Sequence, residues 1–286
     1  MIGLAQDLVI VTGVGYKDSE VTKPEDDIFS SQVCKPNIGA AIALELATAN
    51  YPVVVVARSA EKLDRVRTSI LHRIPMANVI AAPADLSRLD STEAMVSRLP
   101  SNASINVVHS AGLSAGGYVL ADDNPYLPIA SVPLELPTLE FDAVVRSLLV
   151  VMKTLLPRLR GQARSKIVVI SSMSGIRAFP LGYAHASAKA GLHHAIRSLT
   201  LELNQASIYI TEINPGIVNT GLYDSPSVLD SCVMVARTFG YDVGPGAFPQ
   251  MDPREVGRAV RLVMESEAHI LTINLVPFGQ YPHTGS

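Results

Sequence analysis

The sequence has few cysteines, no long apolar run and little net charge, and each absence excludes a class of protein. Two cysteines among 286 residues cannot form a disulfide framework, so we expect a protein of the reducing cytoplasm. No apolar run approaches the roughly 18 residues of a membrane-spanning helix, so no membrane partner is expected. The formal net charge of −3 argues against an extended nucleic-acid surface, which shows as a basic excess.

The beginning of the chain lacks the marks of a targeting segment. The stretch MIGLAQDLVIVTG has no basic start and no small-residue cleavage site after its apolar run, so we expect no signal peptide. The sequence shows no internal repeat and no low-complexity segment, and no metal site is predicted. With 48% hydrophobic residues, the chain fits one large α/β domain over residues 1–286 in preference to two small ones.

What the sequence does contain is a series of short β-branched apolar runs with helical patterns between them. Apolar runs without alternation are typical of parallel strands that are buried on both faces. They predict strands at residues 8–12, 52–57, 78–82, 105–109, 166–171, 207–213 and 270–276. The strongest helical patterns cover residues 37–47, 60–74, 139–160, 182–204 and 253–265.

The segment Ser172–Lys189 follows the predicted strand at 166–171 and enters a helical pattern. A hydroxyl at the end of a strand and a lysine on the next helix lie where ligands bind in an open α/β sheet. Ser172 stands thirteen residues before His185, and Lys189 stands four after it. This segment resembles the active site of the short-chain dehydrogenase/reductase family, in which a serine precedes Tyr-x-x-x-Lys by about a dozen residues. In this sequence a histidine occupies the tyrosine position.

The first glycine turn resembles the same family's Thr-Gly-x-x-x-Gly-Ile-Gly frame, which holds a cofactor phosphate at a helix N-terminus. Gly13, Ile38 and Gly39 keep this frame, Asn37 stands at the middle glycine, and residues 14–36 replace the usual three residues. We expect the insertion to be either a lid over the cofactor phosphates or a surface loop. The motif also fits a strand–loop–helix crossover that binds no ligand.

The residue after the second predicted strand bears on the choice of cofactor. A carboxylate there would bind the ribose 2′-hydroxyl of NAD, whereas an arginine accommodates the 2′-phosphate of NADP. The sequence has Arg58 and no acidic residue at 56–60, so we expect NADP(H) in preference to NAD(H). The alternative is that Arg58 is a solvated loop charge.

Three more segments resemble the family's cofactor site. Asp85-Leu86 is similar to the pair beside the adenine ring, although Asp85 also fits a helix cap. In Ser110-Ala111-Gly112, the last two residues match the family's Asn-Ala-Gly and Ser110 stands at the asparagine position. Residues 215–220 resemble the family's Pro-Gly-x-x-x-Thr segment, although they also fit an ordinary turn. The predicted cofactor-binding residues are Gly13, Asn37, Ile38, Gly39, Arg58, Asp85, Leu86, Ala111, Gly112, Lys189, Pro215, Gly216, Val218 and Thr220.

The resemblance also implies roles for the candidate catalytic residues Ser172, Tyr183, His185 and Lys189. In the family the serine positions the substrate oxygen, the tyrosine donates a proton, and the lysine holds the nicotinamide ribose. His185 is the candidate proton donor, or a residue that only lines the pocket. A nearby lysine cation would favour the neutral imidazole, which still donates one N–H. Tyr183 is the other candidate donor, with packing at the helix start as its alternative.

The resemblance implies a Rossmann-type three-layer αβα sandwich with a seven-stranded parallel sheet. It covers the chain apart from inserted loops at about 14–36 and 113–137 and a substrate loop at about 222–250. In the family, the helix expected at 139–160 carries an asparagine that links the lysine to solvent through a water. Leu148 stands at that position, so the water relay is expected to be missing or rebuilt.

Asn37, Leu148 and His185 depart from the family pattern together, which argues against an ordinary alcohol dehydrogenase. We expect an atypical NADP(H)-dependent oxidoreductase that transfers hydride to an imine, a conjugated C=C or an activated carbonyl of a small organic molecule in specialised biosynthesis. The alternatives are a redox-neutral cyclase or isomerase on the same scaffold and a non-catalytic binding protein. The resemblance also implies a homodimer or homotetramer.

Overall fold

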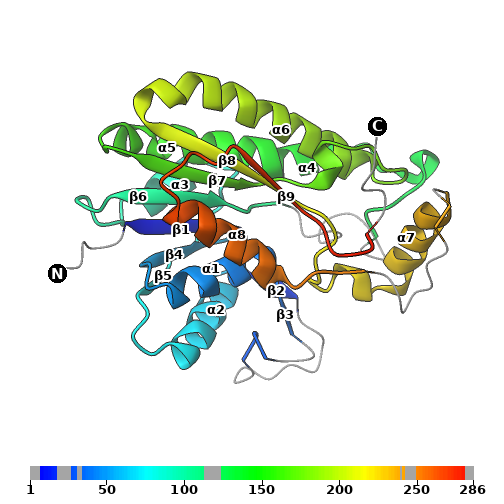
Figure 1. Ribbon diagram of the computed structural model, residues 1–286, viewed down its shortest axis with the longest axis horizontal. Helices are drawn as coiled ribbons and strands as arrows, with labels where there is room; N and C mark the ends of the chain where they lie inside the picture. The colour runs from blue at the N-terminus through cyan, green and yellow to red at the C-terminus, as the bar shows by residue number, and fades with distance from the viewer. Residues whose placement is uncertain are drawn as a thin grey trace.

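Seven parallel strands form one sheet with helices on both faces, which confirms the predicted three-layer αβα sandwich (Figure 1). The structure is a computed structural model and describes residues 7–17, 27–30, 34–112, 124–238, 240–241 and 249–280. The strand order is β5-β4-β1-β6-β7-β8-β9. The strands are β1 (Leu8–Thr12), β4 (Val53–Val56), β5 (Val79–Ala81), β6 (Ile105–His109), β7 (Ser165–Ile170), β8 (Ile208–Pro215) and β9 (Thr272–Leu275).

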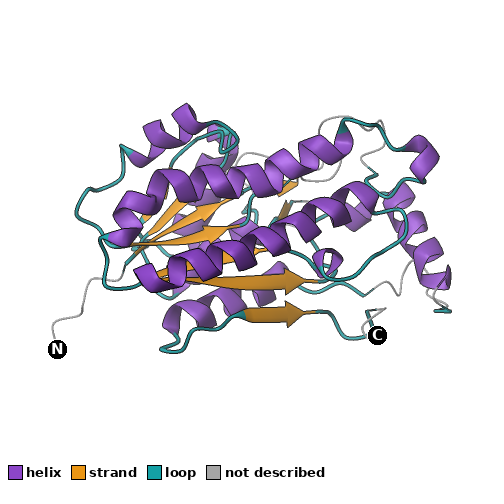
Figure 2. Cartoon of the chain, turned by 90° about the horizontal axis from the view of Figure 1, so that it is seen from above, coloured by secondary structure: helices purple, strands orange, loops and turns teal. Residues whose placement is uncertain are grey.

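The helices run in roughly the direction of the strands and cover the sheet (Figure 2). They are α1 (Ile38–Thr48), α2 (Ala60–Arg73), α3 (Leu89–Val96), α4 (Leu136–Phe141), α5 (Ser147–Arg160), α6 (Tyr183–Leu203), α7 (Pro226–Thr238) and α8 (Pro253–Glu265). None of the helices in the described part of the chain is both long and apolar enough to cross a membrane.

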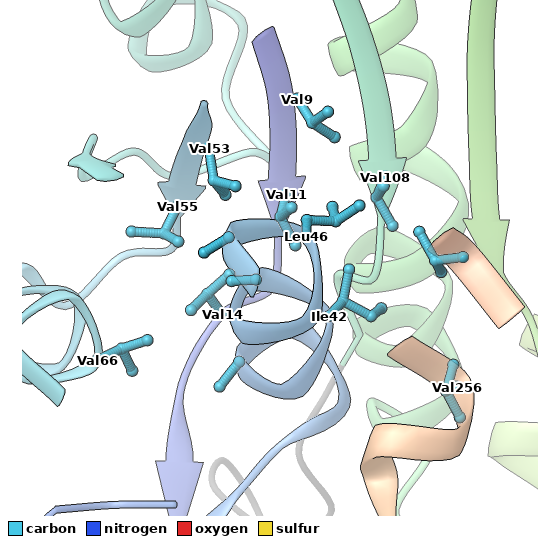
Figure 3. Close-up of a cluster of buried hydrophobic side chains, with 14 of the residues drawn as sticks. Val9, Val11, Val14, Ile42, Leu46, Val53, Val55, Val66, Val108 and Val256 are labelled. Carbon is cyan, nitrogen blue, oxygen red and sulfur yellow. The ribbon is translucent and has the colours of Figure 1, made fainter. Parts of the chain in front are cut away.

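Alternate residues along the strands pack into two apolar clusters, one on each face of the sheet. Val9 and its alternate neighbours face α1, α2 and α8, whereas Ile10 and its alternate neighbours face α5 and α6. Figure 3 shows the first cluster, in which Ile42 and Leu46 of α1 and Val256 of α8 pack near the strand valines. Burying each such side chain contributes about 1.5–3 kcal/mol. The strands therefore consist of continuous β-branched runs because both of their faces are covered.

The strand order reverses at β1. Strands β4 and β5 lie on one side of β1, and β6 to β9 lie on the other. In an open α/β sheet such a reversal leaves a crevice beyond the carboxyl ends of the two central strands, and ligands bind there. The fold therefore places Gly13, after β1, and Ser110, after β6, beside the expected ligand site.

The helix predicted at 139–160 is present but is not α-helical throughout. It begins earlier, as α4, passes through a π-helical turn, η2 (Asp142–Arg146), and continues as α5. A π-helical turn inserts one residue into the helical ladder and is frequent at functional sites. The residues of α4 and α5 therefore do not share the simple helical register that the sequence pattern assumed.

Part of the region predicted as a substrate loop, 222–250, is helical and not irregular. Helix α7 forms because Val228, Cys232, Val235 and Ala236 recur at helical spacing and pack in a small cluster of their own. The partly buried rings of this cluster include Tyr126. Residues 239 and 242–248 of the same region lie outside the described residues.

The insertion at 14–36 packs onto the fold wherever it is described. Its ends pair as a short antiparallel ribbon of β2 (Tyr16–Lys17) and β3 (Lys35–Pro36), and Ile28 is fully buried in the first cluster. The Lys35 ammonium lies 2.7 Å from the Asp224 carboxylate, beyond β8. The described residues thus form a packed ribbon at the rim of the sheet. The rest of the predicted loops, 18–26, 31–33 and 113–123, lies outside the described residues.

Candidate functional site

A cavity of about 1010 Å³ lies at the carboxyl ends of the strands and brings most of the predicted site residues together. Two exceptions are Gly39, which is not part of the wall, and Tyr183, which is 55% exposed and outside it. Residues two apart on a helix point in different directions, so His185 lines the cavity while Tyr183 does not. The predicted residues that line it are Gly13, Asn37, Ile38, Arg58, Asp85, Leu86, Ala111, Gly112, Ser172, His185, Lys189, Pro215, Gly216, Val218 and Thr220.

Two glycines allow the first turn to pass close to its neighbours. Gly13 has a φ of +69°, and a Cβ at this position would collide with the carbonyl oxygen of Ser110. A Cβ on Gly39 would lie 2.6 Å from the carbonyl oxygen of Gly13. Both positions therefore require glycine, because no larger side chain fits between the turn and the elements beside it.

Asn37 joins the two ends of the insertion with its side chain. Its Oδ1 accepts hydrogen bonds from the backbone N–H groups of Gly15 (3.1 Å) and Ala40 (2.9 Å), and its Nδ2 donates to the Gly13 carbonyl (2.8 Å). The side chain thus caps α1 and closes the turn. Because it occupies two N–H groups near the start of α1, fewer backbone donors remain there for a bound phosphate.

The substitution Asn37→Ala is expected to lower the free energy of unfolding by about 1–2 kcal/mol, because it removes the cap of α1 and the bond to Gly13. Urea denaturation measures the change. The control is Asn204→Ala, which alters an exposed asparagine at the end of α6. Equal losses in the two variants would contradict a special role for Asn37.

The part of the cavity beside β4 is positively charged. Arg58 follows β4, Lys62 lies in the first turn of α2, and Lys17 comes from the inserted ribbon. The Lys62 ammonium donates to the Tyr16 carbonyl (3.3 Å) and lies 5.1 Å from the centre of the Tyr16 ring. Of the described lining residues between Ala57 and Lys62, none is acidic. This end of the cavity suits an anion.

Lys189 is a buried cation at the other end of the cavity. Its side-chain ammonium donates to the Ile170 carbonyl (3.1 Å), and only 7% of the residue is exposed. Burial lowers the pKa of Lys189 to about 8, against the opposing attraction of Glu140 and Glu212. Glu212 in turn pairs with His193, whose Nδ1 lies 2.7 Å from its Oε2. Lys189 therefore titrates close to neutral pH.

Ser172 lies at the end of the strand β7, where the sequence placed it. Its Oγ accepts a hydrogen bond from the Ser174 backbone N–H (3.1 Å) and donates one to the Ser174 Oγ (3.1 Å). These bonds cap the short 3-10 turn Met173–Gly175. Ser172 and Lys189 line the same cavity as His185, although they are distant from the glycine turn in sequence.

Leu148, at the predicted water-relay position, is 1% exposed in the second apolar cluster and does not line the cavity. The preceding Ser147 does line it, and its Oγ lies 3.1 Å from Nε2 of His109. The Nδ1 of His109 lies 3.2 Å from the Thr12 hydroxyl. Burial, reinforced by the Lys189 charge, lowers the pKa of His109 to about 3. His109 is therefore a neutral bridge between β1, β6 and α5.

Several lining residues were not identified from the sequence. Glu140 is 3% exposed on α4, and its spacing from the buried Leu136 is a signal that could have indicated its burial. The hydroxyls of Tyr126 and Tyr223 lie 3.4 Å apart across the cavity wall. Gln280 follows the last strand, and its Oε1 accepts a hydrogen bond from the Ile217 N–H (2.7 Å). No local motif marks these last three residues.

The family model described as short chain dehydrogenase matches residues 34–227. The chain belongs to the short-chain dehydrogenase family. The predicted family is confirmed, and so is the prediction of a dehydrogenase or reductase enzyme. The matched segment begins where the insertion ends and includes the glycine frame of α1, Ser172, His185 and Lys189.

Among relatives of this short-chain dehydrogenase is a "Dehydrogenase/reductase SDR family protein 7-like" of Anopheles gambiae. It is 30% identical over 190 residues, which are 65% of this chain and 57% of that protein. The fold is similar to that of an alcohol dehydrogenase from Thermococcus sibiricus complexed with 5-hydroxy-NADP (TM-score 0.72, 19% identity, 98% of this chain and 100% of the other). It is equally similar to an NADPH-bound short chain oxidoreductase of Pseudomonas aeruginosa that contains an atypical catalytic centre (TM-score 0.72, 20% identity, 98% of each chain).

Proposed function

We propose that this short-chain dehydrogenase is NADP(H)-dependent and transfers hydride to an imine, a conjugated C=C or an activated carbonyl of a small organic molecule in specialised biosynthesis. One observation carries the proposal. A single cavity has the glycine turn and Arg58 at one end and Ser172, His185 and Lys189 at the other. A site that links an anion-binding end to a hydroxyl, an imidazole and an amine suits a nicotinamide cofactor with a substrate beside it.

The residues at the anion-binding end fit a 2′-phosphorylated cofactor. Arg58 stands at the carboxyl end of β4, where the ribose of a dinucleotide lies in this fold, and Lys62 adds a second cation. The two similar solved structures described above carry 5-hydroxy-NADP and NADPH. When bound, NADPH supplies the hydride. The cavity volume of about 1010 Å³ leaves room for a substrate.

The residues at the opposite end determine what the substrate can be. Ser172 offers a hydroxyl to position a substrate atom, and Lys189 offers a cation near the nicotinamide ribose. His185 takes the place of the more weakly acidic phenol of the family. The walls beside these groups are largely apolar, which suits a partly hydrophobic molecule. They include Tyr126, Leu139, Met173, Phe179, Leu222, Tyr223, Cys232 and Val235.

The substitution Arg58→Asp is expected to weaken NADPH binding by about 10- to 100-fold and to leave NADH binding nearly unchanged. It removes a charge-assisted bond to the 2′-phosphate and places a repelling carboxylate there. Titration of the purified protein with each cofactor, followed by nicotinamide fluorescence, measures both effects. The control is Arg98→Asp, which makes the same charge change at an exposed position outside the cavity.

The same titration separates the proposal from its alternatives. NADPH binding followed by NADPH oxidation with 2-methyl-1-pyrroline, 2-cyclohexenone or ethyl pyruvate supports the proposal. NADPH binding without oxidation by any member of such a panel favours a redox-neutral enzyme that keeps the cofactor pocket. Binding of neither cofactor contradicts the proposal and favours a non-catalytic binding protein.

A further inference from the structure

Glu140 places a buried carboxylate behind His185. Its side chain is 4% exposed, and among the described residues its Oε2 has no hydrogen-bond partner. Nδ1 of His185 lies 3.7 Å from this atom. A buried carboxylate oxygen without a hydrogen bond is costly, so a native structure that keeps one requires an explanation.

The packing of α4, α6 and the π-helical turn η2 fixes the position of Glu140. Helix α4 packs against α6, which carries His185, and the π-helical turn Asp142–Arg146 follows directly. Leu136, one helical turn before Glu140, is also buried, so this face of α4 is turned inward. The exposed Glu135, at the N-cap of α4, shows that a carboxylate next to this helix does not have to be buried.

Burial also decides how Glu140 can act. Its Oε2 has almost no accessible surface, although other atoms of Glu140 border the cavity. The imidazole side chain is 31% exposed and lines the cavity. The imidazole is therefore the more accessible of the two groups, with its Nδ1 3.7 Å from the buried Oε2.

We infer that Glu140 is a positioning residue whose Oε2, 3.7 Å from Nδ1 of His185, favours the imidazole proton on Nδ1 and leaves Nε2 to exchange a proton with the substrate. A carboxylate behind an imidazole fixes the ring and its tautomer, because only Nδ1–H can donate to it. This inference rests on the proposed function and narrows it. The acceptor is a carbonyl, a conjugated C=C or a neutral imine, each of which gains a proton during reduction, rather than an iminium ion.

The proton and the hydride balance in this step. Hydride adds to one carbon of the double bond, while the Nε2–H bond of the imidazolium breaks and its proton goes to the electron-rich atom at the other end. His185 is left neutral with its proton on Nδ1, facing Glu140, and water returns the lost proton to Nε2. In the oxidative direction the Nε2 lone pair takes the proton from the substrate.

The charges around His185 favour this arrangement. Lys189 lies four residues further along α6, and its cation alone would oppose a charged imidazole. Glu140 from α4 supplies the opposite charge next to the ring. Among the other titratable groups on the elements packed against α6, Asp142 of η2 faces Arg146 at 3.9 Å, and Glu212 of β8 pairs with His193. Glu140 is thus the carboxylate directed at His185.

The first test needs neither cofactor nor substrate. In protein labelled with ¹⁵N-histidine, the nitrogen shifts at alkaline pH are expected to show neutral His185 protonated on Nδ1. In Glu140→Leu the proton should move to Nε2, as in free histidine, because leucine cannot accept it. The variant His185→Gln assigns the signal, and Glu135→Leu, at the N-cap of α4, is the matched control. An Nε2–H tautomer in the wild type, or no change in Glu140→Leu, overturns the inference.

The second test measures single-turnover hydride transfer from NADPH to 2-cyclohexenone and ethyl pyruvate. We expect His185→Gln to slow transfer by about 10²-fold and Glu140→Leu by about 10-fold, with NADPH affinity unchanged. In the double variant Glu140→Leu/His185→Gln, transfer should be no slower than in His185→Gln alone, because Glu140 acts through His185. Multiplied losses would show an independent structural effect and overturn the inference. The controls Glu135→Leu and His194→Gln, both exposed, should retain full rates.

The two tests also distinguish failure of the inference from failure of the proposed function. If the wild type oxidises NADPH with neither probe but keeps the Nδ1–H tautomer, the proposed hydride acceptors are wrong and the Glu140–His185 arrangement stands. If the wild type reduces a probe and Glu140→Leu does so at the same rate, the proposed function stands and the role of Glu140 is wrong.

Discussion

Replacing Lys189 with methionine is expected to reduce hydride transfer by about 10³-fold and to stabilise the protein at neutral pH. The loss of activity follows because the only lysine or arginine of α6 that lines the cavity, within the part of the chain that the structure describes, is removed from the reacting end. The gain in stability follows because the charged amine is buried, and among the described residues it donates a hydrogen bond to the Ile170 carbonyl. Methionine has a similar length and carries no charge to desolvate.

The stability effect has a defined pH window. Burial lowers the pKa of Lys189 from 10.5 to about 8, so between these values the unfolded chain binds a proton that the native protein does not. The free energy of unfolding of the wild type should therefore rise with pH across this window, by about 3 kcal/mol, and the penalty is present in full below pH 8. At pH 7 the variant Lys189→Met should be more stable by about 1–2 kcal/mol, after the lost hydrogen bond is subtracted.

Urea denaturation of the wild type and of Lys189→Met between pH 7 and 10 measures this difference directly. Other groups that titrate in this range contribute equally to both proteins and cancel. Lys153→Met, at an exposed position on α5, is the control and should follow the wild type. Parallel curves for wild type and Lys189→Met would show that burial of the charged amine does not destabilise the protein. Full hydride transfer by Lys189→Met would show that Lys189 takes no part in the reaction.

The parts of this fold that could be predicted from sequence are those set by short-range chemistry. The β-branched runs at 8–12 and 52–57 have no polar alternation, so they specify strands that are covered on both faces. Gly13 and Gly39 mark the turn because no side chain fits there. Asn37 was identified as a departure from the glycine pattern, but only the structure shows that its side chain closes the turn by bonding to Gly13 and Gly15, which lie 24 and 22 positions earlier.

The missed features depend on contacts between elements that are distant in the chain. Glu140 and His185 are 45 residues apart, and nothing in either local pattern indicates that α4 packs against the start of α6. The π-helical turn after Phe141 also shifts the register that a regular helix would have, so Leu148 packs in the core and Ser147 lines the cavity. Helix α7 was missed because the glycines and prolines of the surrounding region led to the prediction of a loop, although the apolar residues within it have helical spacing.

The same pair of residues explains why a tyrosine at position 185 should not by itself produce an ordinary carbonyl reductase. In His185→Tyr the new phenol would lie next to the buried carboxylate of Glu140, which stands 3.7 Å from the present imidazole. A like charge at this distance in a poorly solvated site disfavours the phenolate, and thus opposes the lowering of the phenol pKa that a nearby lysine would otherwise produce. The two substitutions must therefore be made together.

The double variant His185→Tyr/Glu140→Gln is expected to reduce a simple ketone such as acetophenone about 10³-fold faster than His185→Tyr alone, measured as NADPH oxidation at saturating cofactor. Glutamine keeps the size of the buried side chain and removes its charge, so Lys189 alone then acts on the phenol. The matched control, His185→Tyr/Glu135→Gln, removes an exposed charge at the N-cap of α4 and should match the single variant. If the single variant already equals the double variant, Glu140 does not govern this position. If both are inert, Glu140 is not what limits the reaction, and the buried Leu148 at the predicted water-relay position is the next residue to test.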